Sequence, residues 1–122
     1  MRCVRDDGIS AFGPPPSLEI VVSPTPTEGV VVAVAGELDV ATAPEFEATL
    51  LEQLAEGPVR LDMRGLSFMD SSGIRILDAI LRDLPMIGST LVIEPILQPA
   101  VRQIIELTGM SDALPFDTRA ES

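Results

Sequence analysis

The chain has 122 residues, a net charge of −11, and neither histidine nor lysine. This length fits one compact domain, and a hydrophobic content of 46% is sufficient to form one core. An acidic chain without a basic patch is a poor match for nucleic acid or for an anionic membrane surface. We therefore expect no nucleic acid and no membrane as a partner.

The two missing residue types also exclude several kinds of catalytic site. Without histidine there is no Ser-His-Asp triad or imidazole base, and without lysine there is no P-loop or Schiff-base lysine. The remaining enzymatic hypothesis pairs the carboxylates of Asp39 and Asp70, and it ranks last because no metal-ligand cluster accompanies them. We expect a protein that is not an enzyme and that uses no cofactor and no metal.

The first part of the chain differs from the rest in composition. Residues 1–16 contain the single cysteine, Cys3, and a run of three prolines, and they are interpreted as a flexible N-terminal leader. A lone cysteine makes no disulfide framework, and no apolar run reaches the roughly 18–20 residues of a membrane span. These features predict a cytoplasmic protein whose domain covers residues 17–117, with 118–122 as a C-terminal tail.

Four apolar segments predict the strands of a sheet, and the first two are expected to form a hairpin. The run at residues 30–35 is almost continuously apolar, so we expect it to be buried on both faces. Residues 114–116 are a candidate for a short last strand, at an edge because Pro115 lacks a backbone donor. The four segments are residues 18–22, 30–35, 59–63 and 90–93.

Three segments with apolar residues at helical spacing predict helices. The first follows Thr42 and Glu45, which have the spacing of a capping box, and it stops at Gly57. The second runs from Ser72 to Leu84, where Pro85 should end it, and the third begins near Pro99 and ends at Gly109.

The resulting order, β-β-α-β-α-β-α, predicts an α/β fold with a mixed sheet of four or five strands and helices packed on its faces. Helix-linked strands should be parallel with right-handed crossovers. The turns at the carboxyl ends of these strands should form the functional edge.

The turn Asp70-Ser71-Ser72-Gly73 joins the third predicted strand to the second helix. Backbone N–H groups at a helix start favour an anion, so a phosphate is tolerated there. The hydroxyls have two interpretations: they cap the helix, or one of them accepts a phosphate. We expect Ser72 to be the cap and Ser71 to be exposed, with Gly73 allowing a partner's backbone to approach.

Two segments together resemble the STAS domain family, in particular its bacterial anti-sigma factor antagonist branch. They are Gly36-Glu37-Leu38-Asp39 with Ala43-Pro44, and Phe68-Met69-Asp70-Ser71-Ser72-Gly73-Ile74. The resemblance covers roughly residues 18–116 and implies a STAS-like fold. Ile74-Arg75 stands where Leu-Gly is more usual in the family, which places a bulky cation beside the turn.

The resemblance also implies a function in transcription regulation by partner switching. The unphosphorylated form of such a protein binds an anti-sigma factor, which is a serine kinase, and so releases the sigma factor. Phosphorylation breaks the complex, and a metal-dependent serine phosphatase restores it. By position the implied acceptor is Ser71, with Ser72 as the alternative, in a monomer or weak dimer. The implied partner-binding residues are Glu37, Asp39, Asp70, Ser71, Ser72, Gly73 and Arg75.

The alternative hypothesis keeps the STAS fold but not the switch. In that case the chain is a scaffold, or a small-ligand-sensing module, within a larger regulatory assembly. Stable large oligomers or a small molecule retained through purification would favour this alternative.

Overall fold

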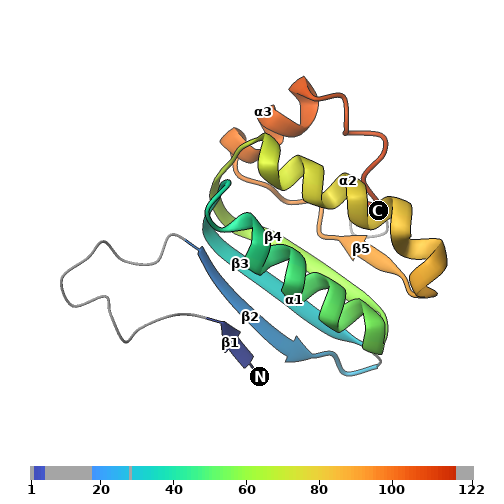
Figure 1. Cartoon of the computed structure of the whole chain (residues 1–122). Helices are drawn as coiled ribbons and strands as arrows, with labels where there is room; N and C mark the ends of the chain where they lie inside the picture. The colour runs from blue at the N-terminus through green and yellow to red at the C-terminus, as the bar shows by residue number, and fades with distance from the viewer. Residues whose placement is uncertain (1, 5–17, 28, 118–122) are drawn as a thin grey trace.

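A computed structural model describes residues 2–4, 18–27 and 29–117 of the chain. In this part of the chain, five strands form one sheet in the order β1-β2-β3-β4-β5, accompanied by three helices (Figure 1). The predicted α/β fold with a mixed sheet is confirmed. The elements are β1 (Arg2–Val4), β2 (Leu18–Pro24), β3 (Val30–Leu38), α1 (Ala43–Glu56), β4 (Val59–Met69), α2 (Ser71–Ile87), β5 (Leu91–Ile93) and α3 (Pro99–Leu107).

The strand directions follow from the connections between the strands. β2 and β3 form the predicted antiparallel hairpin, whereas β3 pairs with β4, and β4 with β5, in parallel. Each parallel pair is joined through a helix, because parallel neighbours need a long crossover. The candidate last strand is reduced to one parallel bridge between Phe116 and Ile93, in which the proline before Phe116 contributes its carbonyl oxygen.

Strand β1 was not expected from the sequence, which assigned residues 1–16 to a leader. Arg2, Cys3 and Val4 pair antiparallel with Val22, Val21 and Ile20 of β2. Without β1, the outer edge of β2 would present unpaired backbone N–H and C=O groups, and pairing satisfies them. Residues 5–17 and 118–122, which hold the rest of the leader and the predicted tail, lie outside the described residues.

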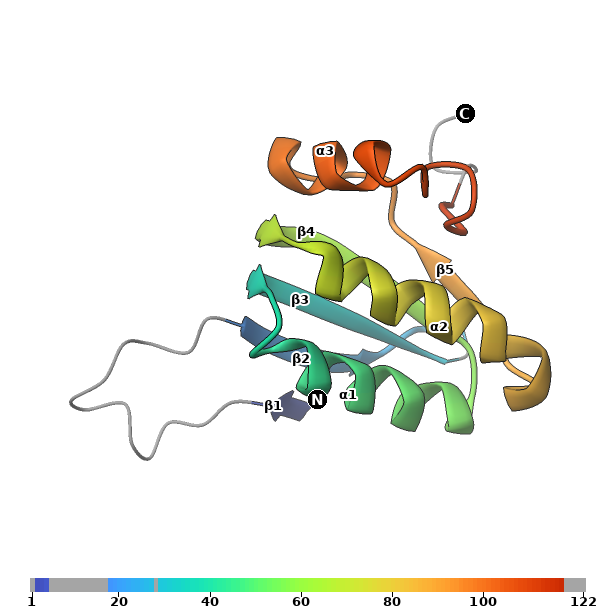
Figure 2. The same ribbon diagram turned by 45° about the horizontal axis from the view of Figure 1, so that its top comes forward.

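Helices α1 and α2 lie side by side on one face of the sheet, and α3 packs against β4 (Figures 1 and 2). Right-handed crossovers between strands that advance in one direction place both connecting helices on the same side. The prediction that helices cover both faces is therefore wrong. For the same reason β3 is buried on one face: Val32 and Val34 are buried, whereas Val31 and Ala33 are half-buried.

The core lies between this helical layer and the covered face of the sheet. Its largest fully buried side chains come from the three helices and from strands β2 to β5. They are Phe46, Leu50 and Leu54 of α1, Leu77 and Ile80 of α2, Ile105 of α3, and Ile20, Leu38, Leu61, Met63, Leu66 and Ile93 of the strands. Burial of these branched and aromatic side chains at about 1.5–3 kcal/mol each is the main force that holds the layers together.

Strands β3 and β4 are both longer than the sequence predicts. Their pairing shifts register between Ala33 and Ala35 and again between Gly36 and Glu37. Gly65 permits the first irregularity, because a Cβ at this position would lie 2.8 Å from the Cβ of Ala35. The strands thus continue until Leu38 pairs with Met69, whereas alternation in the sequence stops earlier.

Helix α2 also runs past its predicted end. Pro85 lies inside the helix, which ends at Ile87 with Gly88 in the left-handed conformation (φ 78°) and its N–H bonded to the Leu84 oxygen. Pro85 lacks a backbone donor and so removes one helical hydrogen bond, yet α2 continues for two more residues to its glycine cap.

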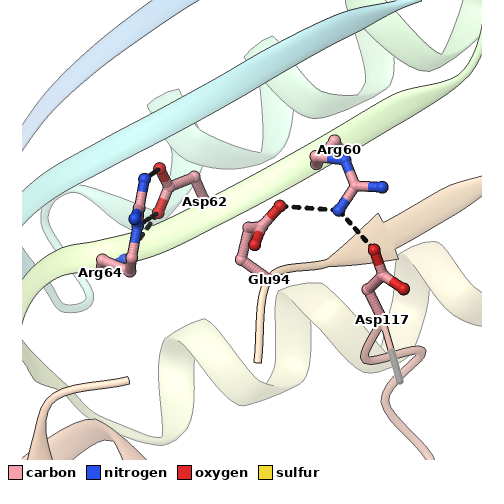
Figure 3. A network of polar contacts seen from close by, with 5 residues as sticks. All are labelled: Arg60, Asp62, Arg64, Glu94 and Asp117. Atoms are coloured by element: carbon pink, nitrogen blue, oxygen red, sulfur yellow. Dashed lines mark hydrogen bonds and ion pairs between the residues drawn. The ribbon is translucent and has the colours of Figure 1, made fainter. Parts of the chain in front are cut away.

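The face of the sheet opposite α1 and α2 carries ion pairs of β4 (Figure 3). Arg60 Nη1 lies 2.6 Å from Glu94 Oε2 and 2.8 Å from Asp117 Oδ2, and these bonds raise the pKa of Arg60. Arg64 binds Asp62 at 2.9 Å, and its hydrogen bond lowers the pKa of Asp62.

No helix within the described residues is long and apolar enough to cross a bilayer.

Candidate functional site

Strands β3 and β4 end side by side, and each is followed at once by an aspartate. Leu38 pairs with Met69, and the N–H of Asp70 donates to the Leu38 oxygen at 3.1 Å. Asp39 and Asp70 therefore start two neighbouring connections at the carboxyl ends of parallel strands, as predicted. We call this region, residues 37–42 and 68–75, the carboxyl edge.

The connection from β3 to α1 is closed by its own side chains. Asp39 Oδ1 accepts from the N–H groups of Ala41 (3.0 Å) and Thr42 (3.1 Å). Thr42 Oγ1 accepts from the Asp39 N–H at 2.9 Å and lies 3.0 Å from the Glu37 oxygen, to which it donates. Both side chains are therefore occupied in fixing this loop.

The predicted capping box of Thr42 and Glu45 is wrong. Thr42 stands at the N-cap of α1, yet its side chain makes no cap hydrogen bond to the helix. In a capping box the Glu45 carboxylate would bind the Thr42 N–H, but Asp39 already accepts from that group. Pro44 does occupy the first turn of α1, as expected.

The connection from β4 to α2 is shorter and is held by Asp70. This residue is the N-cap, with extended backbone, and its Oδ1 accepts from the Ser72 N–H at 2.8 Å. The Gly73 N–H donates to the Asp70 oxygen at 3.1 Å. The expectation that Ser72 caps the helix is wrong, because the carboxylate one residue before Ser71 takes that position.

The two serines of this turn differ in exposure. Ser71 is the first residue of α2 and is exposed, whereas Ser72 is half-buried. Within the described part of the chain, the Ser71 hydroxyl makes no hydrogen bond. A side-chain oxygen that is free of internal bonds and open to solvent is the group that an external enzyme reaches most easily.

Gly73 acts inside the fold rather than at its surface. The residue is buried, and a Cβ at this position would lie 2.7 Å from Met69 Cγ and 2.8 Å from Leu38 Cδ2. The close approach that glycine permits is thus between the first turn of α2 and the ends of β3 and β4. The sequence interpretation had assigned this approach to a partner.

Two apolar residues of the carboxyl edge were missed by the sequence analysis. Val40 is 75% exposed and Phe68 is 44% exposed. Phe68 pairs with Glu37 and lies outward, as alternation from the buried Leu61 and Met63 would place it. Val40 and Phe68 thus add apolar surface beside the polar groups of the carboxyl edge, a combination that protein–protein interfaces also use.

Charges of both signs lie at this edge. Glu37 is exposed, and Asp39 and Asp70 are half-buried. Arg75, one helical turn after Ser71, is exposed and makes no ion pair with any described residue, whereas Arg60, Arg64 and Arg82 each bind a carboxylate. Among the described residues, no group of three or more potential metal ligands comes together.

Comparisons with known proteins agree with the resemblance of the sequence to STAS domains. The family model for the STAS domain matches residues 18–122. An anti-sigma-B factor antagonist of Listeria monocytogenes is 33% identical over 100 residues, covering 80% of this chain and 87% of the relative. The corresponding antagonist of Bacillus subtilis is 26% identical, covering 74% and 83% of the two chains.

Solved structures show the same fold. The crystal structure of an anti-sigma factor antagonist from Mycobacterium paratuberculosis superimposes with a TM-score of 0.67 at 30% identity, covering 82% of this chain and 85% of that one. The antagonist SpoIIAA in its unphosphorylated form gives a TM-score of 0.65 at 23% identity, covering 84% and 90%. With the family model covering residues 18–122, the chain belongs to the STAS domain family.

Proposed function

We propose that this protein is an anti-sigma factor antagonist that is switched by phosphorylation of Ser71. The unphosphorylated form binds an anti-sigma factor with serine kinase activity and so releases a sigma factor. The kinase transfers the γ-phosphoryl group of ATP to Ser71 Oγ, which loses its proton, and ADP leaves. A metal-dependent phosphatase hydrolyses the phosphoserine and restores the binding form.

One observation carries the proposal: the Ser71 hydroxyl is exposed, free of internal hydrogen bonds, and surrounded by a surface suited to a partner. The family membership and the names of the relatives support the partner class. The proposed contact residues are Glu37, Asp39, Asp70, Ser71, Ser72 and Arg75, together with the exposed Val40 and Phe68. In this arrangement the chain is a substrate and a binding module rather than an enzyme.

The physical basis of the switch is charge at a docking surface. A phosphate adds about −1.5 to −2 charges at neutral pH, next to three carboxylates of the carboxyl edge. Desolvating such a dianion, or placing it opposite partner acids, costs several kcal/mol. A thousandfold loss of affinity needs about 4 kcal/mol, so no large conformational change is required.

The fold itself should survive the modification, because Ser71 Oγ bonds to no other group of the described chain. SpoIIAA, which shares the fold, has been solved in a phosphorylated form as well. This shows that a fold of this kind accommodates a phosphate, and the identity of the acceptor in the present chain is our proposal.

The test is phosphorylation by a candidate kinase-type anti-sigma factor with ATP, followed by mapping of the modified residue by mass spectrometry. We expect phosphate on Ser71 in the wild type and in Ser72→Ala, and none in Ser71→Ala. In calorimetric titrations, Ser71→Ala should bind the kinase about as well as the unmodified wild type, and Ser71→Glu at least tenfold more weakly. Phosphate found only on other residues, with unchanged binding of Ser71→Glu, would overturn the proposal.

A further inference from the structure

Among residues 29–117, Arg75 and Arg102 are the arginines that make no ion pair, and of these two Arg75 is the one that lies at the carboxyl edge. Arg60 and Arg64 bind carboxylates across the open face, and Arg82 binds Asp78 on the outer side of α2. Asp78 is three residues after Arg75 and within its reach on the helix, but it is already paired with Arg82. Arg75 therefore presents an exposed guanidinium at the carboxyl edge, and no carboxylate of the described residues pairs with it.

The position of Arg75 relative to Ser71 is fixed by α2. Residues four apart on a helix lie on the same side, with about 5–6 Å between their Cβ atoms. An acidic group four residues before a basic one is the more favourable orientation of such a pair. A phosphate on Ser71 would thus meet the guanidinium in the orientation that a helix favours, and guanidinium binds phosphate through two parallel hydrogen bonds.

The backbone of the helix start offers the phosphate less than a helix start usually does. The Ser72 N–H donates to Asp70 Oδ1, and the Gly73 N–H donates to the Asp70 oxygen. Two donors of the first turn are therefore occupied, one by the negative carboxylate of Asp70 and one by its backbone carbonyl. Glu37, Asp39 and Asp70 are the other charged side chains of this edge, and all of them repel a phosphate. Arg75 is left as its counter-ion.

We propose that Arg75 exchanges partners when the switch operates. In the unphosphorylated protein its guanidinium binds a carboxylate of the anti-sigma factor, and after phosphorylation it binds the phosphate on Ser71 instead. The modification then acts twice on the interface, because it introduces a dianion and also removes a cation from the partner. This inference rests on the proposed function and adds a residue that determines partner choice.

The intramolecular half is tested on protein with phosphoserine placed at position 71 by genetic code expansion, so that no kinase is needed. The second pKa of the phosphate is read from a ³¹P NMR titration of the full chain. Replacing Arg75 by glutamine should raise this pKa by about 0.3–0.7 units, since an ion pair at this spacing contributes a few tenths of a kcal/mol or somewhat more for a dianion. The difference should shrink in 1 M salt.

The matched control is the double variant Arg82→Gln with Asp78→Asn, because it removes an ion pair from the same helix without freeing the Asp78 carboxylate to bind Arg75. Arg82 lies eleven residues after Ser71, which is about 16 Å along the axis and beyond the Debye length at physiological salt. The phosphate pKa of the control should equal that of the wild type. The phosphate pKa of Arg75→Lys should fall between those of the wild type and Arg75→Gln, because a compact ammonium lacks the planar fork of a guanidinium. Equal pKa values in wild type and Arg75→Gln would overturn the ion pair.

The intermolecular half is tested with unphosphorylated protein and the anti-sigma kinase. Arg75→Gln should weaken binding about tenfold, as expected for loss of a hydrogen bond between charged groups, whereas the double variant of Arg82 and Asp78 should not change it. Unchanged affinity of Arg75→Gln would overturn the exchange of partners. If the wild type bound no such kinase at all, the proposed function would fail, while the ³¹P titration would still decide whether Arg75 pairs with the phosphate.

Discussion

The connections that follow β3 and β4 begin alike and are built differently. Each starts with an aspartate directly after the last paired residue of its strand, and a threonine or serine follows shortly after. After β3, the carboxylate of Asp39 and the hydroxyl of Thr42 bind each other's backbone and close the loop. After β4, Asp70 caps α2 by itself, and the hydroxyl of Ser71 remains free.

This difference separates a structural hydroxyl from an available one. Thr42 Oγ1 accepts one hydrogen bond and donates another, so transfer of a phosphate to it would break the loop that positions α1. Ser71 can be modified without the loss of any internal bond. Sequence motifs alone place an acid and a hydroxyl at both connections, and the hydrogen bonds show which hydroxyl is free of internal partners among the described residues.

The largest expected effect comes from removing the carboxylate that closes the first connection. Asp39→Ala removes the acceptor of the Ala41 N–H and the side-chain acceptor of the Thr42 N–H, which keeps only the backbone oxygen of residue 39, and should lower the free energy of unfolding by about 2 kcal/mol. Urea denaturation with an unchanged m-value measures this. Asp39→Asn is the control: its amide oxygen can accept the same bonds, so most of the stability should return.

The Asn variant also separates loop geometry from charge. If Asp39 contacts the partner through its charge, Asp39→Asn should fold nearly as well as the wild type and bind the anti-sigma factor more weakly. A loss below 0.5 kcal/mol in Asp39→Ala would mean that this loop does not depend on its side chains, and the contrast with the β4 connection would disappear.

The second prediction removes the hydroxyl that works with Asp39. Thr42→Val keeps the shape of the side chain but leaves the Asp39 N–H without its acceptor, and should cost about 1.5 kcal/mol of unfolding free energy. Thr42→Ser, which keeps the oxygen, should cost much less. Combined with Asp39→Ala, the loss should be smaller than the sum, because the two residues share one network.

The sequence predicted β2 to β5 and the three helices, because these elements carry clear apolar periods, but it missed β1. The hairpin, the parallel pairs and the order of the elements all follow from these periods and from the handedness of crossovers. The apolar pattern did not predict the lengths of β4 and α2, which depend on glycines. Gly65 lies at a register shift within β4, and Gly88 rather than Pro85 ends α2. Such positions depend on tertiary neighbours that no local pattern contains.

For the candidate site, the sequence located the turn but did not show which of its residues caps the helix. Capping by an aspartate or by a serine is equally compatible with Asp70-Ser71-Ser72, and only the register of the first helical residue distinguishes them. Alternation from the buried Leu61 and Met63 places Phe68 outward, but its large apolar side chain gave no reason to expect a surface position. The free state of Arg75 depends on the pairing of Asp78 with Arg82, which is a choice among equal neighbours on one helix.

A third prediction concerns the cap of the second connection. Asp70→Ala leaves the Ser72 N–H without its side-chain acceptor, and should lower the free energy of unfolding by about 1 kcal/mol. This is less than for Asp39→Ala because one hydrogen bond is lost rather than two. Asp70→Asn should restore the cap, and the two variants are compared by thermal denaturation. An equal loss for both would assign the effect to charge at the helix start instead of the hydrogen bond.

The smallest expected effect is also the one that defines the switch. Ser71→Ala removes an exposed hydroxyl without an internal partner, so the free energy of unfolding should change by less than about 0.5 kcal/mol. Ser72→Ala, at the half-buried neighbour, is the matched control in the same denaturation series. A loss above 1 kcal/mol in Ser71→Ala would show that the hydroxyl belongs to the fold, as that of Thr42 does, and phosphorylation would then disturb the helix start as well as the interface. If Ser71→Ala loses little stability and accepts no phosphate, phosphorylation acts on the protein surface and not on the stability of the fold.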